Sequence, residues 1–218
     1  MAQSPKGGND RGMNQYSIDS PLASAALALA RQHETTSVLN HSLRTHRYAL
    51  RHAELLGMMA DDDFDAELLF VACVLHDIGA FDAFDGPQRF EVEGADAAAA
   101  LLRDHGRSDA DADLVWQGIA LHTSPGIAER RGTLPMLTRV GIRTDFSSVT
   151  IPEAERVEIE RELPRLGLDD ELPALVVAQA LRQPEKARAS SWPSDLVRAH
   201  QGSNWGPGPT PAESLARP

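Results

Sequence analysis

The stretch LLFVACVLHDIGAF, residues 68–81, indicates the fold most directly. It opens with an unbroken apolar run, continues with the polar pair His76 and Asp77, and then reaches Gly79. The longer apolar runs of this chain are rich in Leu and Ala rather than in Val and Ile, which favours helix over strand. Glycine commonly follows the end of a helix. We therefore predict a buried helix whose C-terminal end carries a histidine and an aspartate.

Similar helix signals recur along the chain. Ser20 before Pro21 is typical of an N-cap followed by proline at the first helical position. The acidic stretch DDDFD, residues 61–65, suits a helix N-terminus, and Gly57 and Gly106 suit the positions after helix ends. The predicted helices cover residues 21–32, 37–56, 61–79, 91–105, 109–122, 134–146, 152–163, 170–183 and 193–200. The sequence thus predicts an all-α helical bundle.

Composition predicts one helical domain between two tails. Residues 1–17 are rich in Gly, Asn and Gln, and residues 201–218 are rich in Gly and Pro, so we expect both ends to be disordered. Residues 18–200 then form the domain, which is long enough to bury a core without disulfides. Any bound metal is therefore expected to have a functional rather than a structural role. The single cysteine, Cys73, is expected to be a buried thiol.

The charge and hydropathy of the chain exclude several classes of partner. A formal net charge of -11 makes nucleic acid a poor partner, because phosphate binding needs a basic surface. The sequence contains no run of 18 apolar residues, so no membrane span is predicted. The polar N-terminus lacks the apolar core of a signal peptide. We expect a cytoplasmic protein that acts on a small-molecule substrate, with a homo-oligomer left open.

Four residues form the predicted metal site. His76 and Asp77 at the end of an apolar helix are costly unless something satisfies them, and a divalent cation does so through direct ligation. His41 lies on the preceding predicted helix, and Asp145 ends a later one. Two histidines and two aspartates give a nearly neutral site around a divalent transition metal, with zinc expected first and iron or manganese as alternatives. The alternative for His76 and Asp77 is a polar pair at a surface helix end.

The order of an early His, a His-Asp pair and a late Asp resembles the HD-domain superfamily of metal-dependent hydrolases. Four segments are similar to its cyanamide hydratase-like branch: NHSLRTHRYA (40–49), ACVLHDIG (72–79), RFEVEGADAAAALLRDHG (89–106) and WQGIALHTSPGIA (116–128). The resemblance implies a helical HD domain and a metal-activated water as the nucleophile. Its branch implies hydration of a small nitrile-like substrate such as cyanamide.

Three further residues are predicted to take part in catalysis: His105, His122 and Arg44. In dinuclear HD proteins two histidines between the His-Asp pair and the last Asp hold a second metal, and His105 and His122 fall in that order. The alternatives are proton donors to the substrate, or caps at helix C-termini. Arg44 shares a helical face with His41 and is expected to reach the substrate or to pair with Asp77; the alternative is a solvated ion pair.

Several residues near these candidates are predicted to lie outside the metal site itself. We expect His46 and His52 to lie at the surface or in an interface, and Trp116 in the core or the pocket wall. The loop of residues 80–89 is expected to form the rim of the active site, together with the Arg89 and Glu91 side chains.

Three alternatives to a hydratase stay open. The same activated water serves a phosphohydrolase that acts on a nucleotide or small phosphoester. A di-iron HD oxygenase requires that both His105 and His122 bind metal. The third alternative is a non-catalytic HD module that binds a ligand.

Overall fold

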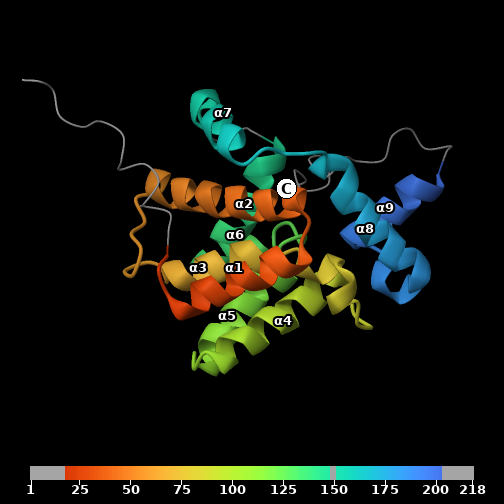
Figure 1. Cartoon of the computed structure of the whole chain (residues 1–218), viewed down its shortest axis with the longest axis horizontal. Coiled ribbons are helices and arrows are strands. Elements are labelled where there is room, and N and C mark those ends of the chain that lie inside the picture. Colours follow the sequence, from red (N-terminus) through yellow and green to blue (C-terminus); the bar gives the residue numbers. More distant parts are fainter. Residues whose placement is uncertain (1–17, 148–150, 203–218) are drawn as a thin grey trace, which may run out of the picture.

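The computed structural model describes residues 18–147 and 151–202, and within these ranges it contains helices and no β-strand. The predicted all-α fold is confirmed (Figure 1). The predicted tails lie outside the described residues, except for residues 201 and 202, and the domain limits stay a prediction. No helix in the described part is long and apolar enough to cross a membrane. The elements are α1 (Pro21–His33), α2 (Thr36–Leu55), α3 (Ala66–Leu75), η1 (Ile78–Ala80), η2 (Asp82–Phe84), α4 (Phe90–Asp104), α5 (Asp109–Ala120), η3 (Ala128–Arg130), α6 (Thr133–Ser147), α7 (Glu153–Glu162), α8 (Leu168–Arg182), η4 (Pro184–Ala187) and α9 (Trp192–Gln201).

Helix α3 is the centre of the main core. Every residue from Leu68 to Leu75 is buried, including Cys73 as expected. A helix that is apolar on all sides must be surrounded by other helices. Here α1, α2, α5 and α6 all pack against it (Figure 1). This packing places the C-terminal end of α3 inside the molecule.

The start and end of α3 differ from the prediction. Residues 61–63 form turns, with Asp61 in the left-handed region at φ 66°, and the helix begins at Ala66. Aspartate is a weak former of helix interiors but a strong N-cap, and the Asp65 carboxylate accepts from the Leu68 amide at 3.0 Å. The α-helix ends at Leu75, four residues before the predicted end at Gly79, and Gly79 lies within the 3₁₀ turn η1.

Glycine at position 79 is required by a close approach between η1 and α4. A Cβ on Gly79 would lie 2.0 Å from the Phe90 carbonyl oxygen and 2.6 Å from the Gly94 amide nitrogen. Both neighbours are backbone atoms, so no side chain can move aside to make room. The turn that follows Asp77 is therefore locked against the start of α4.

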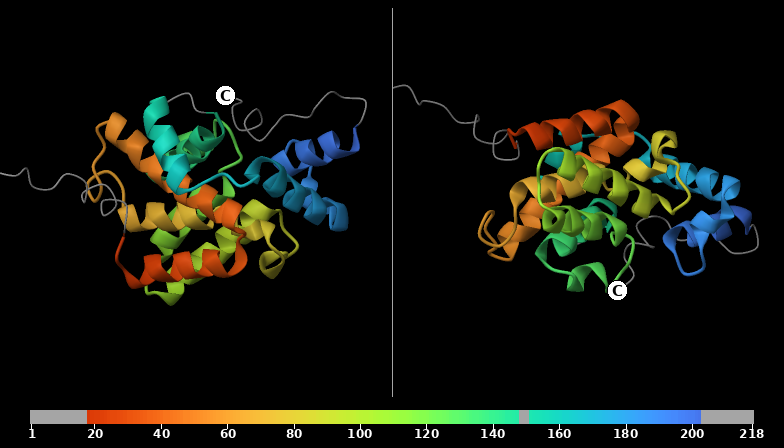
Figure 2. Two further views of the ribbon diagram at one scale, coloured as in Figure 1. Left: turned by 45° about the horizontal axis from the view of Figure 1, so that its top comes forward. Right: turned by 90° about the horizontal axis from the view of Figure 1, so that it is seen from below.

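A second apolar cluster attaches the C-terminal helices to the same region. Helices α8 and α9 lie together at one end of the molecule, beside the start of α4 (Figures 1 and 2). Their apolar side chains pack with Phe81 and Phe90, close to the end of α3. The members of this cluster are Val38, Ala80, Phe81, Phe90, Leu168, Leu172, Val176, Val177, Trp192 and Leu196. As a result, α8 and α9 cover the position where α3 ends in its polar pair.

Candidate metal centre

His76 and Asp77 occupy the turn between α3 and η1. His76 is the C-cap of α3, and Asp77 follows with φ -104° and ψ 1°. The exposed fractions are 0% for His76 and 1% for Asp77, so the alternative of a polar pair at the surface is excluded. The His76 Nδ1 atom lies 2.8 Å from the Cys73 carbonyl oxygen, which fixes the ring.

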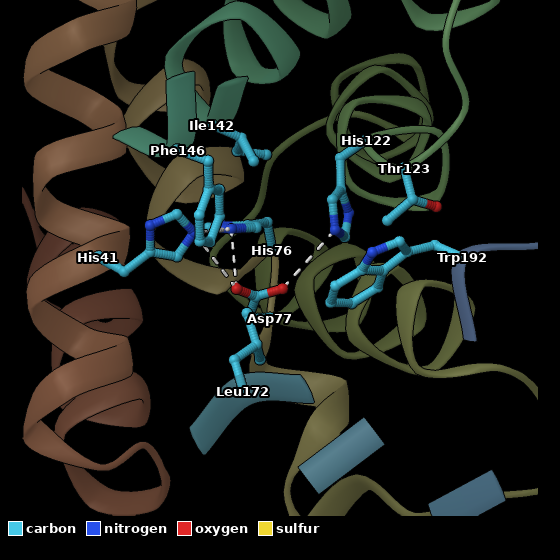
Figure 3. A pocket seen from close by; sticks show the side chains of 9 residues that line it. All are labelled: His41, His76, Asp77, His122, Thr123, Ile142, Phe146, Leu172 and Trp192. Carbon is cyan, nitrogen blue, oxygen red and sulfur yellow. Dashed lines mark hydrogen bonds and ion pairs between the residues drawn. The ribbon is translucent and has the colours of Figure 1, made fainter. Parts of the chain in front are cut away.

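His41 approaches this pair from α2. Its Nε2 atom lies 3.1 Å from His76 Nε2 and 3.5 Å from the Asp77 Oδ2 atom. The Asp77 Oδ2 atom is in turn 3.0 Å from His76 Nε2. Figure 3 shows the three side chains pointing toward one another across a small space. One ligand atom from each residue lies within 4.8 Å of the others, so these residues could hold a metal ion together.

The tautomers implied by the hydrogen bonds make this centre rich in acceptors. The Nδ1 atoms of His76 and His41 face the Cys73 carbonyl and the Asp145 carboxylate, so each neutral ring places its proton there. Their Nε2 lone pairs then face each other and the Asp77 carboxylate. The Asp77 Oδ2 atom is buried and accepts no hydrogen bond. Hydrogen-bond acceptors that face one another without a donor between them are stabilised by positive charge. These three side chains therefore fit a divalent cation.

The pKa values of the pair show the same demand for positive charge. Burial alone would raise the pKa of Asp77, but the neighbouring His76 ring lowers the pKa of that carboxyl far below its usual range. Burial opposes protonation of His76, and the Asp77 charge outweighs it and raises the pKa of the imidazole. A proton or a metal cation at Nε2 therefore stabilises the centre.

Asp145, predicted as the fourth ligand, is not part of this group. Its Oδ2 atom lies 2.7 Å from His41 Nδ1, on the side of the ring away from His76. Arg44 binds the same carboxylate through Nε at 2.6 Å and Nη2 at 2.7 Å. The structure therefore corrects the expected pairing of Arg44 with Asp77 and places Arg44 behind Asp145. Helices α2 and α6 approach closely there, since a Cβ on Gly141 would lie 2.4 Å from the Thr45 carbonyl oxygen.

The two remaining candidate histidines are placed very differently. His122 follows α5, is 2% exposed, and its Nε2 atom lies 3.6 Å from the Asp77 Oδ1 atom (Figure 3). Burial lowers its pKa to about 3, and its Nδ1 atom faces the Ile119 carbonyl at 2.7 Å. His105 is exposed at the end of α4, where Nδ1 pairs with the Leu101 carbonyl at 2.9 Å. The structure thus brings His122 to the centre and leaves His105 as a helix cap.

The pocket around the centre is small and largely apolar. Its walls are His41, His76, Asp77, His122, Thr123, Ile142, Phe146, Leu172 and Trp192 (Figure 3). The space open to a water-sized sphere is about 10 Å³, which is roughly enough for one water molecule. Only a small ligand fits without movement of the walls.

The loop of residues 80–89, which was predicted to form the rim of the active site, does not line this pocket. Asp85 of this loop instead pairs with Lys186 and Arg182. Glu91 is fully buried and accepts from the Thr123 hydroxyl at 2.6 Å, so it supports a wall residue. Trp116 is partly buried outside this pocket, with Nε1 donating to Asp96 at 2.7 Å.

Two histidines on α2, His46 and His52, lie in interfaces between helices, which is one of the two expected places. His46 and His52 are 2% and 7% exposed, so neither is a surface residue. The His46 ring packs edge-on against Phe70 with a centroid distance of 5.0 Å, and His52 Nε2 lies 2.9 Å from the Thr144 hydroxyl. Both sit in the contact surfaces of α2 with the helices around it.

Sequence reasoning missed several wall residues. Thr123 and Phe146 directly follow His122 and Asp145, so adjacency to a candidate was an available signal. Leu172 and Trp192 come from α8 and α9 and carried no local signal, because only tertiary packing brings them to the pocket.

Comparison with known proteins agrees with this geometry. The family model described as HD domain matches residues 38–181, which include His41, His76, Asp77 and Asp145. The chain belongs to the HD domain family. This HD chain is also 31% identical over 142 residues to Cyanamide hydratase DDI2 and to Cyanamide hydratase DDI3, both from Saccharomyces cerevisiae. Each match covers 61% of this chain and 60% of the yeast protein. The resemblance of the sequence to the HD superfamily and to its cyanamide hydratase-like branch is thereby confirmed.

Proposed function

We propose that this protein is a metal-dependent hydratase that adds water across the carbon–nitrogen triple bond of a small nitrile-like substrate such as cyanamide. In that reaction cyanamide and one water give urea, and no other reactant is needed. The observation that carries the proposal is a centre of converging acceptors, His41, His76 and Asp77, in a small apolar pocket. The similarity to the yeast cyanamide hydratases supports the choice of substrate.

His41, His76 and Asp77 would hold the metal. Nitrogen and carboxylate donors suit zinc first, with ferrous iron or manganese as alternatives. A divalent cation held by these residues would supply an activated water as the nucleophile. Asp145 would orient the His41 ring through Nδ1 instead of acting as a ligand, since carboxylates commonly fix a metal-binding histidine in this way.

His122 is placed to accept a hydrogen bond at Nε2. Its Nδ1 proton is committed to the Ile119 carbonyl, so the lone pair at Nε2 faces the space beside Asp77. We propose that His122 Nε2 accepts a hydrogen bond from the reacting water and orients it. This replaces the expectation that His122 donates a proton to the substrate.

The chemistry of the walls argues against a phosphoester substrate. Among the described residues that line the pocket there is no lysine or arginine. The nearby guanidinium of Arg44 is occupied by the Asp145 carboxylate. Apolar walls without a basic side chain favour an uncharged substrate over a phosphate dianion.

A di-iron oxygenase and a non-catalytic module are less well supported than the hydratase. An oxygenase with two histidine ligands for a second ion would use His105, which lies exposed at the end of α4. A non-catalytic module would bind a ligand without turning it over. Turnover by the metal-loaded protein separates such a module from the hydratase.

The direct experiment is a comparison of substrates with metal-loaded protein. Urea formation from cyanamide is expected to exceed hydrolysis of p-nitrophenyl phosphate and of nucleoside monophosphates. Asp77→Asn should abolish the activity, because it removes the charged ligand of the centre. Rapid nucleotide hydrolysis with no hydration of cyanamide or of a simple nitrile would overturn the proposal.

A further inference from the structure

Trp192 contributes a buried donor to the pocket that has no acceptor. It is the first residue of α9 and lies outside residues 38–181, the part that matches the HD family. Its side chain lines the pocket, and the residue is only 7% exposed. The indole Nε1 atom is buried and makes no hydrogen bond within the described protein. Buried donors are nearly always paired, and leaving one unpaired is destabilising.

Packing holds this indole beside the metal centre. The Phe90 ring contacts Trp192 at a centroid distance of 5.7 Å and His122 at 5.6 Å, so one side chain supports both. Figure 3 shows the indole extending from α9 toward Asp77 and His122. Ser191 caps α9 by accepting from the Ser194 amide at 3.3 Å, and this fixes the position of the first turn. The unpaired donor is thus held at the edge of the small space where a substrate must bind.

We propose that Trp192 is a substrate-binding residue, and that its Nε1–H group donates a hydrogen bond to the terminal nitrogen of a small uncharged nitrile. This inference rests on the proposed function and assigns the acceptor end of the substrate. When water adds to the nitrile carbon, a carbon–oxygen bond forms, one carbon–nitrogen π bond breaks and its electron pair moves to that nitrogen, which takes up the proton that the water loses. A hydrogen bond to the nitrogen strengthens as this charge develops, so the Trp192 donor favours the transition state over the bound substrate.

The other polar wall group near the indole is already used. The Thr123 hydroxyl donates its proton to the Glu91 carboxylate at 2.6 Å, so it is not a free donor for the substrate. The imidazoles of His41, His76 and His122 turn their acceptor atoms inward. Trp192 therefore supplies the donor that the remaining walls lack.

The test removes the donor and keeps an aromatic ring. Trp192→Phe in the metal-loaded protein is expected to lower kcat for cyanamide about a hundredfold with a small change in KM, the size of effect seen when one such donor is lost. The matched control is Trp116→Phe, which deletes an indole whose Nε1 pairs with Asp96 outside this pocket, and it should leave kcat unchanged. Equal kcat values for Trp192→Phe and wild type would overturn the inference while leaving the hydratase intact.

A binding readout separates the inference from the reaction. The chain has three tryptophans, so an NMR spectrum of ¹⁵N-labelled, metal-loaded protein contains three indole N–H signals. The signal absent from Trp192→Phe belongs to Trp192. Titration with acetonitrile should shift that proton downfield, as a hydrogen bond forms, and leave the Trp116 signal in place. If nitrile hydration fails but this shift is seen, the binding role stands alone; no shift at saturating acetonitrile would disprove it.

Discussion

The Asp145 carboxylate lies between the Arg44 guanidinium and the His41 imidazole, with three contacts of 2.6–2.7 Å. All three side chains are fully buried. Burial alone would raise the pKa of Asp145, but the hydrogen bonds from Arg44 and His41 lower it far below its usual range. Asp145 thus stays ionised and, held by Arg44, fixes the position of the His41 ring.

The first prediction concerns the stability of this arrangement. Arg44→Met should lower the free energy of unfolding of the metal-free protein by about 3–5 kcal/mol, because it leaves the Asp145 charge buried without its strongest partner. Arg103→Met breaks an exposed pair with Asp109 and should cost less than about 1 kcal/mol. Urea denaturation measures both. Equal, small effects would show that Asp145 does not depend on Arg44.

The second prediction separates an orienting role from direct ligation. Asp145→Asn should weaken metal affinity by about 10–100-fold, as is typical for loss of the group that orients a ligand histidine. Asp77→Asn removes a ligand and should have a larger effect. Competition with a chelator measures both affinities, and circular dichroism checks that each variant is folded. Equal losses in the two variants would identify Asp145 as a ligand.

Local signals were sufficient for the helical frame of this site. The apolar run of α3 had to be buried on every side, and the polar pair His76 and Asp77 at its end pointed to a metal. Helix ends at Ser20 and Gly57 were also visible, because caps and glycine act on their immediate neighbours. The segment 61–65 was misread since acidic residues suit both a first helical turn and a loop before an N-cap.

Contacts between distant segments were beyond local signals. Arg44 and Asp145 are 101 residues apart, and nothing near Arg44 distinguishes Asp145 from Asp77 as its partner. His105 and His122 both lie at helix ends, so local sequence signals do not distinguish them. Only His122 is buried. The burial of His46 depends on how α2 packs with its neighbours, which periodicity does not fix.

The third prediction tests this distinction between the two histidines. His122→Ala should lower turnover about a hundredfold, since it removes the group that orients the reacting water. His105→Ala should leave turnover nearly unchanged and cost about 1 kcal/mol or less, as expected for a cap near a helix C-terminus. Steady-state kinetics with cyanamide and thermal unfolding provide the two measurements. Equal loss of turnover in both variants would show that His105 also takes part in the reaction.

The fourth prediction uses the buried His46. Burial lowers its pKa to about 3, while an unfolded histidine has a pKa near 6.5. Below pH 6.5 the unfolded chain therefore binds a proton that the folded chain does not, so stability falls as the pH drops toward 3. The contribution to the slope is about 1.4 kcal/mol per pH unit.

His46→Leu should make the unfolding free energy less dependent on pH in this range, by about one proton. His200→Leu replaces an exposed histidine and serves as the control, with the slope of the wild type. Denaturation curves at several pH values between about 4 and 6.5 measure the slopes. A wild-type slope in His46→Leu would mean that His46 protonates in the folded state.

We propose that His41, His76 and Asp77 hold one divalent transition metal. Elemental analysis of the purified protein tests it directly. We predict close to one equivalent of metal in the wild type and in the His105→Ala control, and loss of most of it in His76→Ala and in Asp77→Ala, with all variants folded. Metal content that is unchanged in both His76→Ala and Asp77→Ala would show that these residues do not bind the metal.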